Sequence, residues 1–163
     1  LVTQANGLTT LRINLAIDGR FVCAGSGVLA VGVLDRKDWP EGCQLICDGG
    51  RTQHALVSTW ERHDLWTLEP RRGRLLPTVV HGPTCMAFDQ LGRHGLPGSV
   101  GPGDVLLWAE AGAYHLPWET RFSHGLAEVW WVEDDTLRRV RRAESYAGYA
   151  GRWEPEPPRR TAG

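Results

Sequence analysis

The sequence predicts a mainly β protein, a Greek-key-type β-barrel that ends in a short helix and a Pro-rich tail. Its 163 residues include 20 Gly and 10 Pro, which indicate many turns and few long helices. Short apolar runs lie between these turns, a pattern typical of barrels and sandwiches. With 42% hydrophobic residues the chain can enclose one core. We therefore expect one domain over residues 1–150 and a disordered tail over 151–163.

Each predicted element has its own local signal. The first strand alternates apolar with polar or small residues, the second is long enough to bulge at Gly25 and Gly27, and the fifth holds a continuous apolar run. The predicted strands are 11–17, 21–34, 44–47, 74–80, 104–110 and 127–133. A helix is predicted over 137–149. Charged residues and prolines after Gly151 predict the tail.

Composition and charge exclude several classes of function. The 18 Lys and Arg balance 19 Asp and Glu, which argues against binding to nucleic acid or to an anionic membrane. The sequence contains neither a transmembrane run nor a signal peptide, so we expect a cytoplasmic protein with free thiols. Cys43 and Cys47 lie on one predicted strand, roughly 13 Å apart, too far to share a metal. The six His form no ligand pattern, and no metal site is expected.

Two short segments carry the densest chemistry. The first, His81-Gly-Pro-Thr-Cys85-Met-Ala-Phe-Asp89, presents a thiol after a Gly-Pro turn, with a carboxylate four residues later. The second, Gly112-Ala-Tyr114, follows the buried strand, and its glycine permits a close approach to the backbone. From spacing alone, a single Cys is usually a small buried hydrophobe. The eight Trp suit a core or a protein interface equally well. The arginine clusters at 71–74 and 138–142 are expected to be solvated faces.

Taken in order, these segments resemble one known family. It is the C-terminal β-domain of the pyridoxal-phosphate decarboxylases of the alanine-racemase-like fold, which act on diaminopimelate, ornithine and arginine. The central matching motifs are Gly82-Pro-Thr-Cys85-Met-Ala-Phe-Asp89, Leu96-Pro-Gly-Ser-Val-Gly-Pro-Gly103-Asp104 and Gly112-Ala-Tyr114. Weaker matches lie at 18–22, 48–56, 127–131 and 142–146. The resemblance covers about residues 11–150.

The resemblance implies a role for several residues. Cys85 would return a proton to the substrate α-carbon after CO₂ leaves, opposite the cofactor of the other protomer. Tyr114 and Arg20 would bind the phosphate of pyridoxal 5'-phosphate. Met86 and Asp89 would lie at the substrate, with Asp89 orienting the loop or pairing across a dimer interface, where Gly112 would allow close approach. The implied partners are an N-terminal (β/α)₈ barrel, a second protomer in a homodimer or heterodimer, and an α-amino acid.

The sequence departs from the family pattern at chemically important positions. The family's Schiff-base lysine belongs to the (β/α)₈ barrel, and Lys37 is the only lysine here, so this chain alone is not expected to be a complete decarboxylase. Met86 stands where many members carry an acid that binds a distal ammonium group, which disfavours diamino-acid substrates. His54 stands where diaminopimelate decarboxylases have a carboxylate-binding Arg, so His54 would be a weaker, pH-sensitive donor to the substrate unless Arg51 takes over. Ile17 and Asp18 replace a Glu-Pro pair whose Glu meets the pyridine nitrogen in the family, so either Asp18 substitutes for that Glu or the contact is lost.

Other functions stay open at this point. A non-catalytic relative that regulates a true decarboxylase is favoured by Ile17 and Met86. A racemase of the same fold is disfavoured by the Cys85 motif, since those enzymes use a tyrosine base. The remaining alternative is a β-barrel binding domain without catalytic chemistry.

Overall fold

A computed structural model describes residues 19–52, 62–122 and 124–153. The chain divides into two compact units, Leu1–Thr120 and Arg121–Gly163, which are described separately below. Within the described ranges, no helix is long and apolar enough to cross a lipid bilayer. The predicted domain boundary at residue 150 stays a prediction.

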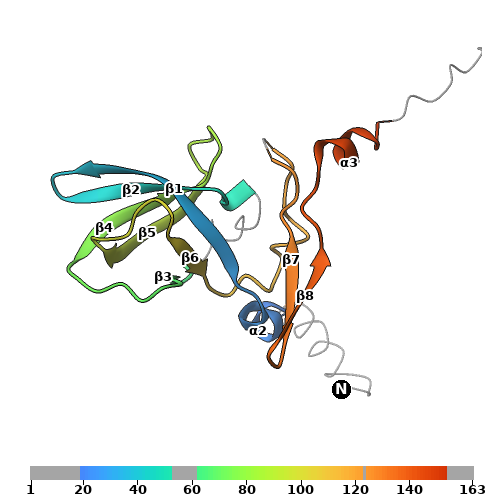
Figure 1. Cartoon of the computed structure of the whole chain (residues 1–163), viewed down its shortest axis with the longest axis horizontal. Helices are drawn as coiled ribbons and strands as arrows, with labels where there is room; N and C mark the ends of the chain where they lie inside the picture. The colour runs from blue at the N-terminus through green and yellow to red at the C-terminus, as the bar shows by residue number, and fades with distance from the viewer. Residues whose placement is uncertain (1–18, 53–61, 123, 154–163) are drawn as a thin grey trace, which may run out of the picture. The chain divides into compact units, whose positions relative to one another are not determined.

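The first unit is built on one curled sheet that forms a nearly closed barrel (Figure 1). Its strands are β1 Leu29–Trp39, β2 Gly42–Cys47, β3 Leu65–Thr67, β4 Leu75–His81, β5 Gln90–Pro97 and β6 Val105–Trp108. They lie in the order β3-β6-β1-β2-β4-β5, and every neighbouring pair is antiparallel except β2 and β4. The prediction of a mainly β, barrel-like fold with a short helix is confirmed.

The core of this unit lies inside the curled sheet. Leu45, Val80, Leu106 and Trp108 are completely buried, and they come from three different strands, β2, β4 and β6. At roughly 1.5–3 kcal/mol for each fully buried large apolar side chain, such residues contribute most of the stabilisation of the barrel. In β6, Leu106 and Trp108 share the face that is completely buried, and β6 pairs with a strand along each of its edges.

The predicted strand over 21–34 is wrong in its first half. The helix α2 Gly19–Cys23 and the 3₁₀ turn η1 Ala24–Ser26 occupy this stretch, and the strand begins only at Leu29. Phe21 is 92% exposed, so its apolar side chain does not belong to the core. The predicted strand over 11–17 lies outside the described residues.

The second unit contains a hairpin and a short helix. The hairpin consists of β7 Val129–Glu133 and β8 Thr136–Arg141, joined by a two-residue turn in which Asp134 has a φ of 49°. The predicted helix over 137–149 is therefore wrong in its first part. Only α3 Tyr146–Ala150 is helical, and the side chain of Ser145 caps it by accepting a 3.1 Å hydrogen bond from the amide of Gly148.

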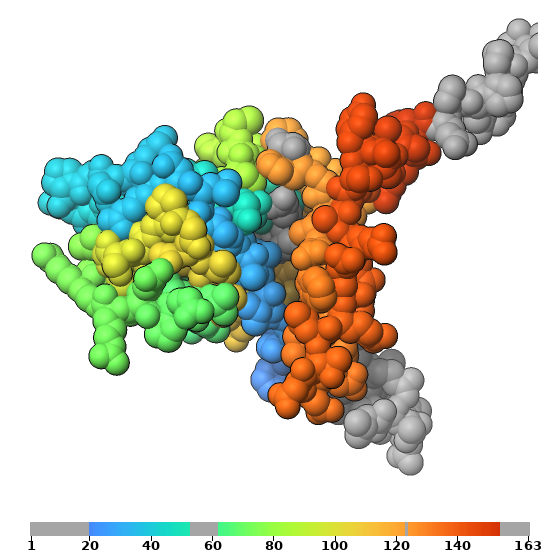
Figure 2. All heavy atoms as spheres, viewed as in Figure 1, coloured from blue at the N-terminus to red at the C-terminus, as the bar shows by residue number. Residues whose placement is uncertain are grey.

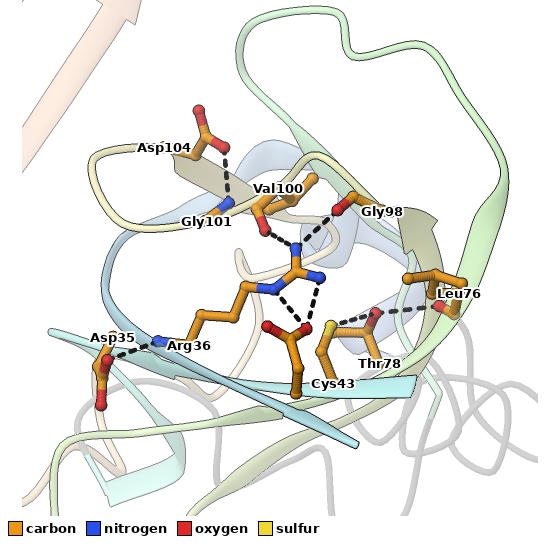
Figure 3. A network of polar contacts seen from close by, with 10 residues as sticks. Asp35, Arg36, Cys43, Leu76, Thr78, Gly98, Val100, Gly101 and Asp104 are labelled. Carbon is orange, nitrogen blue, oxygen red and sulfur yellow. Dashed lines mark hydrogen bonds and ion pairs between the residues drawn. The ribbon is translucent and has the colours of Figure 1, made fainter. Parts of the chain in front are cut away.

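One arginine ties β1 to the turn between β5 and β6 (Figure 3). The guanidinium of Arg36 donates to the carbonyls of Gly98 and Val100, at 2.7 and 2.5 Å. It also donates two hydrogen bonds to one carboxylate oxygen of Asp38. These bonds raise the pKa of Arg36. This arrangement satisfies two backbone acceptors in the Gly- and Pro-rich turn that follows β5.

Candidate functional site

The loop between β4 and β5 is organised around the buried carboxylate of Asp89, which is 1% exposed. One oxygen, Oδ2, accepts hydrogen bonds from the hydroxyl and the amide of Thr84, at 2.6 and 3.1 Å. The other oxygen, Oδ1, accepts a 2.8 Å hydrogen bond from the amide of Arg51. Backbone hydrogen bonds from Gly82 to the Asp89 carbonyl and from Asp89 to the Met86 carbonyl close the loop. The carboxylate thus holds together the segment that carries Cys85.

Two glycines leave the space that this carboxylate fills. A Cβ atom on Gly50 or on Gly82 would lie 2.3 Å from Oδ1 of Asp89. Gly50 belongs to the Asp48-Gly-Gly segment, which follows β2, and Gly82 opens the loop after β4. Since β2 and β4 are parallel neighbours, their C-terminal ends meet at one edge of the sheet. Two motifs that are far apart in the sequence are thereby brought into contact.

Burial and the carboxylate act in opposite directions on the bases around this loop. Burial lowers the pKa of Arg51, and the negative charge of Asp89 partly offsets that decrease. The same two effects act on His81, whose pKa is lowered by burial and raised to a smaller extent by Asp89. His81 is therefore neutral at pH 7.

The loop presents the two residues that follow Thr84 in different ways. The side chain of Cys85 is exposed. Met86 is half-buried, and its amide donates a 3.3 Å hydrogen bond to the hydroxyl of Thr84. A thiol at this position is accessible to a reacting group. The buried thiol of Cys47 differs, because burial raises its pKa to about 12 and keeps it protonated.

The Gly112-Ala-Tyr114 segment follows β6 and packs against the 3₁₀ turn. The amide of Gly112 donates a 3.0 Å hydrogen bond to the Ala24 carbonyl, and a Cβ on Gly112 would lie 2.0 Å from the Cys23 carbonyl oxygen. The close approach at Gly112 is therefore made inside the chain. Its expected place at a dimer interface stays a prediction.

Tyr114 adopts a left-handed backbone conformation, with a φ of 64°. This conformation is uncommon for a residue with a bulky side chain and is found more often at functional positions. The ring of Tyr114 is 37% exposed and lies 5.5 Å from the ring of Trp118. The phenol is thus held at the surface against a neighbouring aromatic side chain.

A buried aromatic cluster beneath this segment has no counterpart among the sequence predictions. The rings of His63 and His115 lie 4.0 and 5.1 Å from the ring of Trp108, and all three residues are at most 2% exposed. Burial lowers the pKa of His63, and the positive charge of Arg20 lowers it further. Arg20 therefore acts on His63 through its charge. Each His stands alone among unrelated residues, so no pattern in the sequence indicates its burial.

The predicted site residues fall into two groups. Cys85, Met86 and Asp89 share the β4–β5 loop, whereas Arg20 lies on α2 and Tyr114 follows β6. In the described part of the chain, no hydrogen bond joins Cys85 to Tyr114. His54 lies outside the described residues. Among the described residues, no three His, Cys, Asp or Glu side chains lie together so that they could hold a metal ion.

Comparison with known proteins gives one family and a set of similar structures. Residues 20–112 match the family model described as pyridoxal-dependent decarboxylase, C-terminal sheet domain. No curated protein matches. The similar structures include diaminopimelate decarboxylase from M. jannaschii in complex with L-lysine, with 19% identity and a TM-score of 0.77. It is matched over 92% of this chain and 37% of that one.

Two further structures show higher identity. A point mutant of diaminopimelate decarboxylase from Helicobacter pylori, complexed with L-lysine, is 26% identical with a TM-score of 0.69, over 78% of this chain and 32% of that one. Lysine/ornithine decarboxylase from Vibrio vulnificus, complexed with cadaverine, is 27% identical with a TM-score of 0.57, over 64% and 29%. This chain therefore spans about a third of the length of the proteins it resembles.

Proposed function

The chain belongs to the family of the pyridoxal-dependent decarboxylase C-terminal sheet domain, and from this premise we propose that it completes the active site of an amino-acid decarboxylase. The observation that carries the proposal is the β4–β5 loop, where a buried carboxylate fixes a segment whose thiol is exposed. A fixed, accessible thiol is suited to proton transfer, which requires the donor to be held within hydrogen-bond reach of the reacting atom.

The donor set of this chain fits pyridoxal 5'-phosphate in part. The phenol of Tyr114 and the guanidinium of Arg20 are groups that suit a phosphate. Lys37 is the only lysine of the sequence, and it lies on β1 opposite Gln44, away from the segments that carry Cys85 and Tyr114. We propose that an N-terminal (β/α)₈ barrel, in the same or another chain, supplies the cofactor's lysine.

Each residue of the loop would then have a defined task. When bound, the cofactor would take up the electron pair that the departing carboxylate leaves on the substrate. Cys85 would donate its thiol proton to the α-carbon, so that a C–H bond forms as the S–H bond breaks, and the thiolate would regain a proton from water. Asp89 and Thr84 would hold the loop in place. Tyr114 would orient the phosphate.

Met86 bears on which amino acid is accepted. A thioether cannot pair with an ammonium group, and burying an unpaired charge is unfavourable. We propose a substrate without a free distal ammonium, such as an amino acid with an acidic or acylated side chain. The assembly would be a cytoplasmic dimer that contains the (β/α)₈ barrel. The second candidate, a regulator without catalysis, is favoured by this same replacement at Met86.

The proposal is tested by comparing the 163-residue chain with the product of its whole natural reading frame. CO₂ release from a panel of α-amino acids is measured for both, and cofactor attachment is assayed by borohydride reduction and peptide mapping. Activity is expected only where a barrel lysine is present. The proposal fails if the 163-residue chain decarboxylates by itself, or if the cofactor is fixed stoichiometrically on Lys37. The regulator is favoured if the whole product has no activity but alters that of a separate decarboxylase.

A further inference from the structure

The hairpin of the second unit exposes large apolar side chains on both of its faces. The most exposed apolar residues of its strands are Trp130, Trp131, Val132, Leu137 and Val140, whose exposed fractions run from 43% to 69%. The cross-strand pair of Val132 and Leu137 lies on the face of Trp130, whereas Trp131 points to the other face. A two-stranded hairpin is only marginally stable in water, and exposed apolar patches mark surfaces that bind other molecules.

This hairpin is also strongly basic along one strand. Residues 136–142 include no acidic residue, and their arginines are Arg138, Arg139, Arg141 and Arg142. Arg139 lies 3.6 Å from the carboxylate of Glu128 and 5.5 Å above the ring of Trp130. In the described part of the chain, Arg138 and Arg142 form no ion pair. The arginine cluster at 138–142, which the sequence predicts to be a solvated face, therefore places positive charge beside exposed tryptophans.

Within the described chain, β8 is paired along one edge of its backbone only, the edge that faces β7. The second sheet contains only β7 and β8, so each is an edge strand. From Thr136 to Val140, no backbone hydrogen bond from another segment of the described chain reaches the outer edge of β8. In Figure 2 the atoms of this hairpin are drawn in orange. Among the described residues, nothing pairs with the outer donors and acceptors of Thr136–Val140, the row that an added strand would use.

We propose that β8 is a docking edge for an extended acidic segment of a partner protein, which adds a third strand to the hairpin. Main-chain hydrogen bonds to β8 would align the segment, and its carboxylates would pair with Arg138 and Arg142. Its apolar side chains would cover Leu137, which lies on the opposite face of β8 from Arg138. Tryptophan and arginine are the residues that most often dominate the energetics of such interfaces.

Charge decides between this partner and a second copy of the chain. Pairing β8 with β8 of a second copy would place arginines opposite arginines, which is destabilising. Pairing β8 with the outer edge of β7 of a second copy would bring Glu128 and Glu133 toward the arginines. The experiment below detects that arrangement as self-association of the chain. A basic edge can also serve only to prevent aggregation, in which case no acidic segment binds.

The test uses the full 163-residue chain and two capped synthetic peptides of the length of β8, one alternating Val with Glu and one alternating Val with Lys. Affinity is measured by calorimetry at low and high salt, and amide exchange locates the bound peptide. We expect the Glu peptide to bind, to protect the amides of Thr136–Arg141 and to weaken with salt. Arg138→Glu with Arg142→Glu should weaken binding about tenfold or more.

The matched control is Arg72→Glu with Arg74→Glu, which makes the same change of charge in the other unit and should leave the affinity unchanged. If the double reversal on β8 unfolds the hairpin, Arg138→Gln with Arg142→Gln replaces it and should weaken binding by a smaller factor. The proposal is overturned if the Glu peptide fails to bind, if the Lys peptide binds equally well, or if protection lies outside β8. It is also overturned if sedimentation shows self-association that protects β8, since a second copy is then the occupant.

Discussion

Replacement of the buried carboxylate of Asp89 by an amide tests the architecture of the β4–β5 loop. The carboxylate accepts three hydrogen bonds, two from Thr84 and one from the amide of Arg51 at 2.8 Å. In Asp89→Asn, the amide oxygen can keep the bonds to Thr84 only if its NH₂ group faces the N–H of Arg51. Two donors would then oppose each other in a buried site, so one charge-assisted hydrogen bond is lost and one backbone donor is unsatisfied.

The size of the effect follows from how little the site can relax. The carboxylate lies so close to Gly50 and Gly82 that a Cβ on either would be 2.3 Å from Oδ1, which leaves no room for the amide to swing outward. A lost hydrogen bond to a charged group or an unsatisfied buried donor costs roughly 1–3 kcal/mol. We therefore expect Asp89→Asn to lower the free energy of unfolding by about 1–3 kcal/mol.

The measurement is urea denaturation of wild type and variant, together with amide hydrogen exchange at Arg51 and Thr84, which should become faster. Asp35→Asn is the matched control, because the exposed Asp35 carboxylate accepts only a local hydrogen bond from the amide of Arg36. Its effect should stay within about 0.5 kcal/mol. Equal destabilisation by the two substitutions, or unchanged exchange at Arg51 and Thr84, would show that Asp89 does not hold the loop.

Three further predictions follow from other features. In the complete enzyme, Met86→Asp should raise kcat/KM for lysine, ornithine and meso-diaminopimelate relative to the preferred substrate, and a wild type that already prefers a diamino acid would refute the argument. Burial lowers the pKa of His63, His81 and His94, so these histidines take up protons at a higher pH in the unfolded chain than in the folded one. Lowering the pH from about 7 to about 5.5 therefore stabilises the unfolded chain and should decrease the urea midpoint. A constant midpoint would contradict this prediction. Gly112→Ala, whose Cβ would lie 2.0 Å from a carbonyl oxygen, should cost about 1–3 kcal/mol in thermal or urea unfolding, whereas an unchanged stability would exclude this packing.

The sequence predicts best where a segment's own pattern settles its environment. The apolar run of β6 predicts a strand, and the strand is there. It also predicts burial on both faces, but only the face of Leu106 and Trp108 is completely buried, whereas Val105 and Leu107 on the other face are half-buried. The pattern around Phe21 and Val22 predicts a strand because apolar residues follow them, yet both lie exposed on α2. The 3₁₀ turn that follows this helix packs against Gly112, a residue far along the chain, and no local pattern indicates that contact.

In β8 and in the candidate site, too, contacts between distant residues decide what a local sequence pattern does not indicate. Leu and Arg favour helix from Leu137 onward, but pairing with β7 across the turn at Asp134 overrides that preference. The Cys85 motif stands out in the sequence, whereas the Arg51 amide that holds its loop is 38 residues from Asp89 and belongs to another strand end. Contacts of this kind depend on the register of parallel β2 and β4, which composition and spacing do not specify.

The most direct measurement of the central claim is the product ratio of Cys85→Ala in the complete enzyme. If Cys85 gives the proton to the α-carbon, turnover should fall by about 10²-fold or more, as expected when a general acid is lost. Product should also shift from the amine toward the aldehyde, with the amino group left on the cofactor. The matched control is Cys23→Ala, since Cys23 is the other exposed thiol of the described chain, and it should change neither quantity. An unchanged ratio of amine to aldehyde in a variant of normal stability would contradict the account.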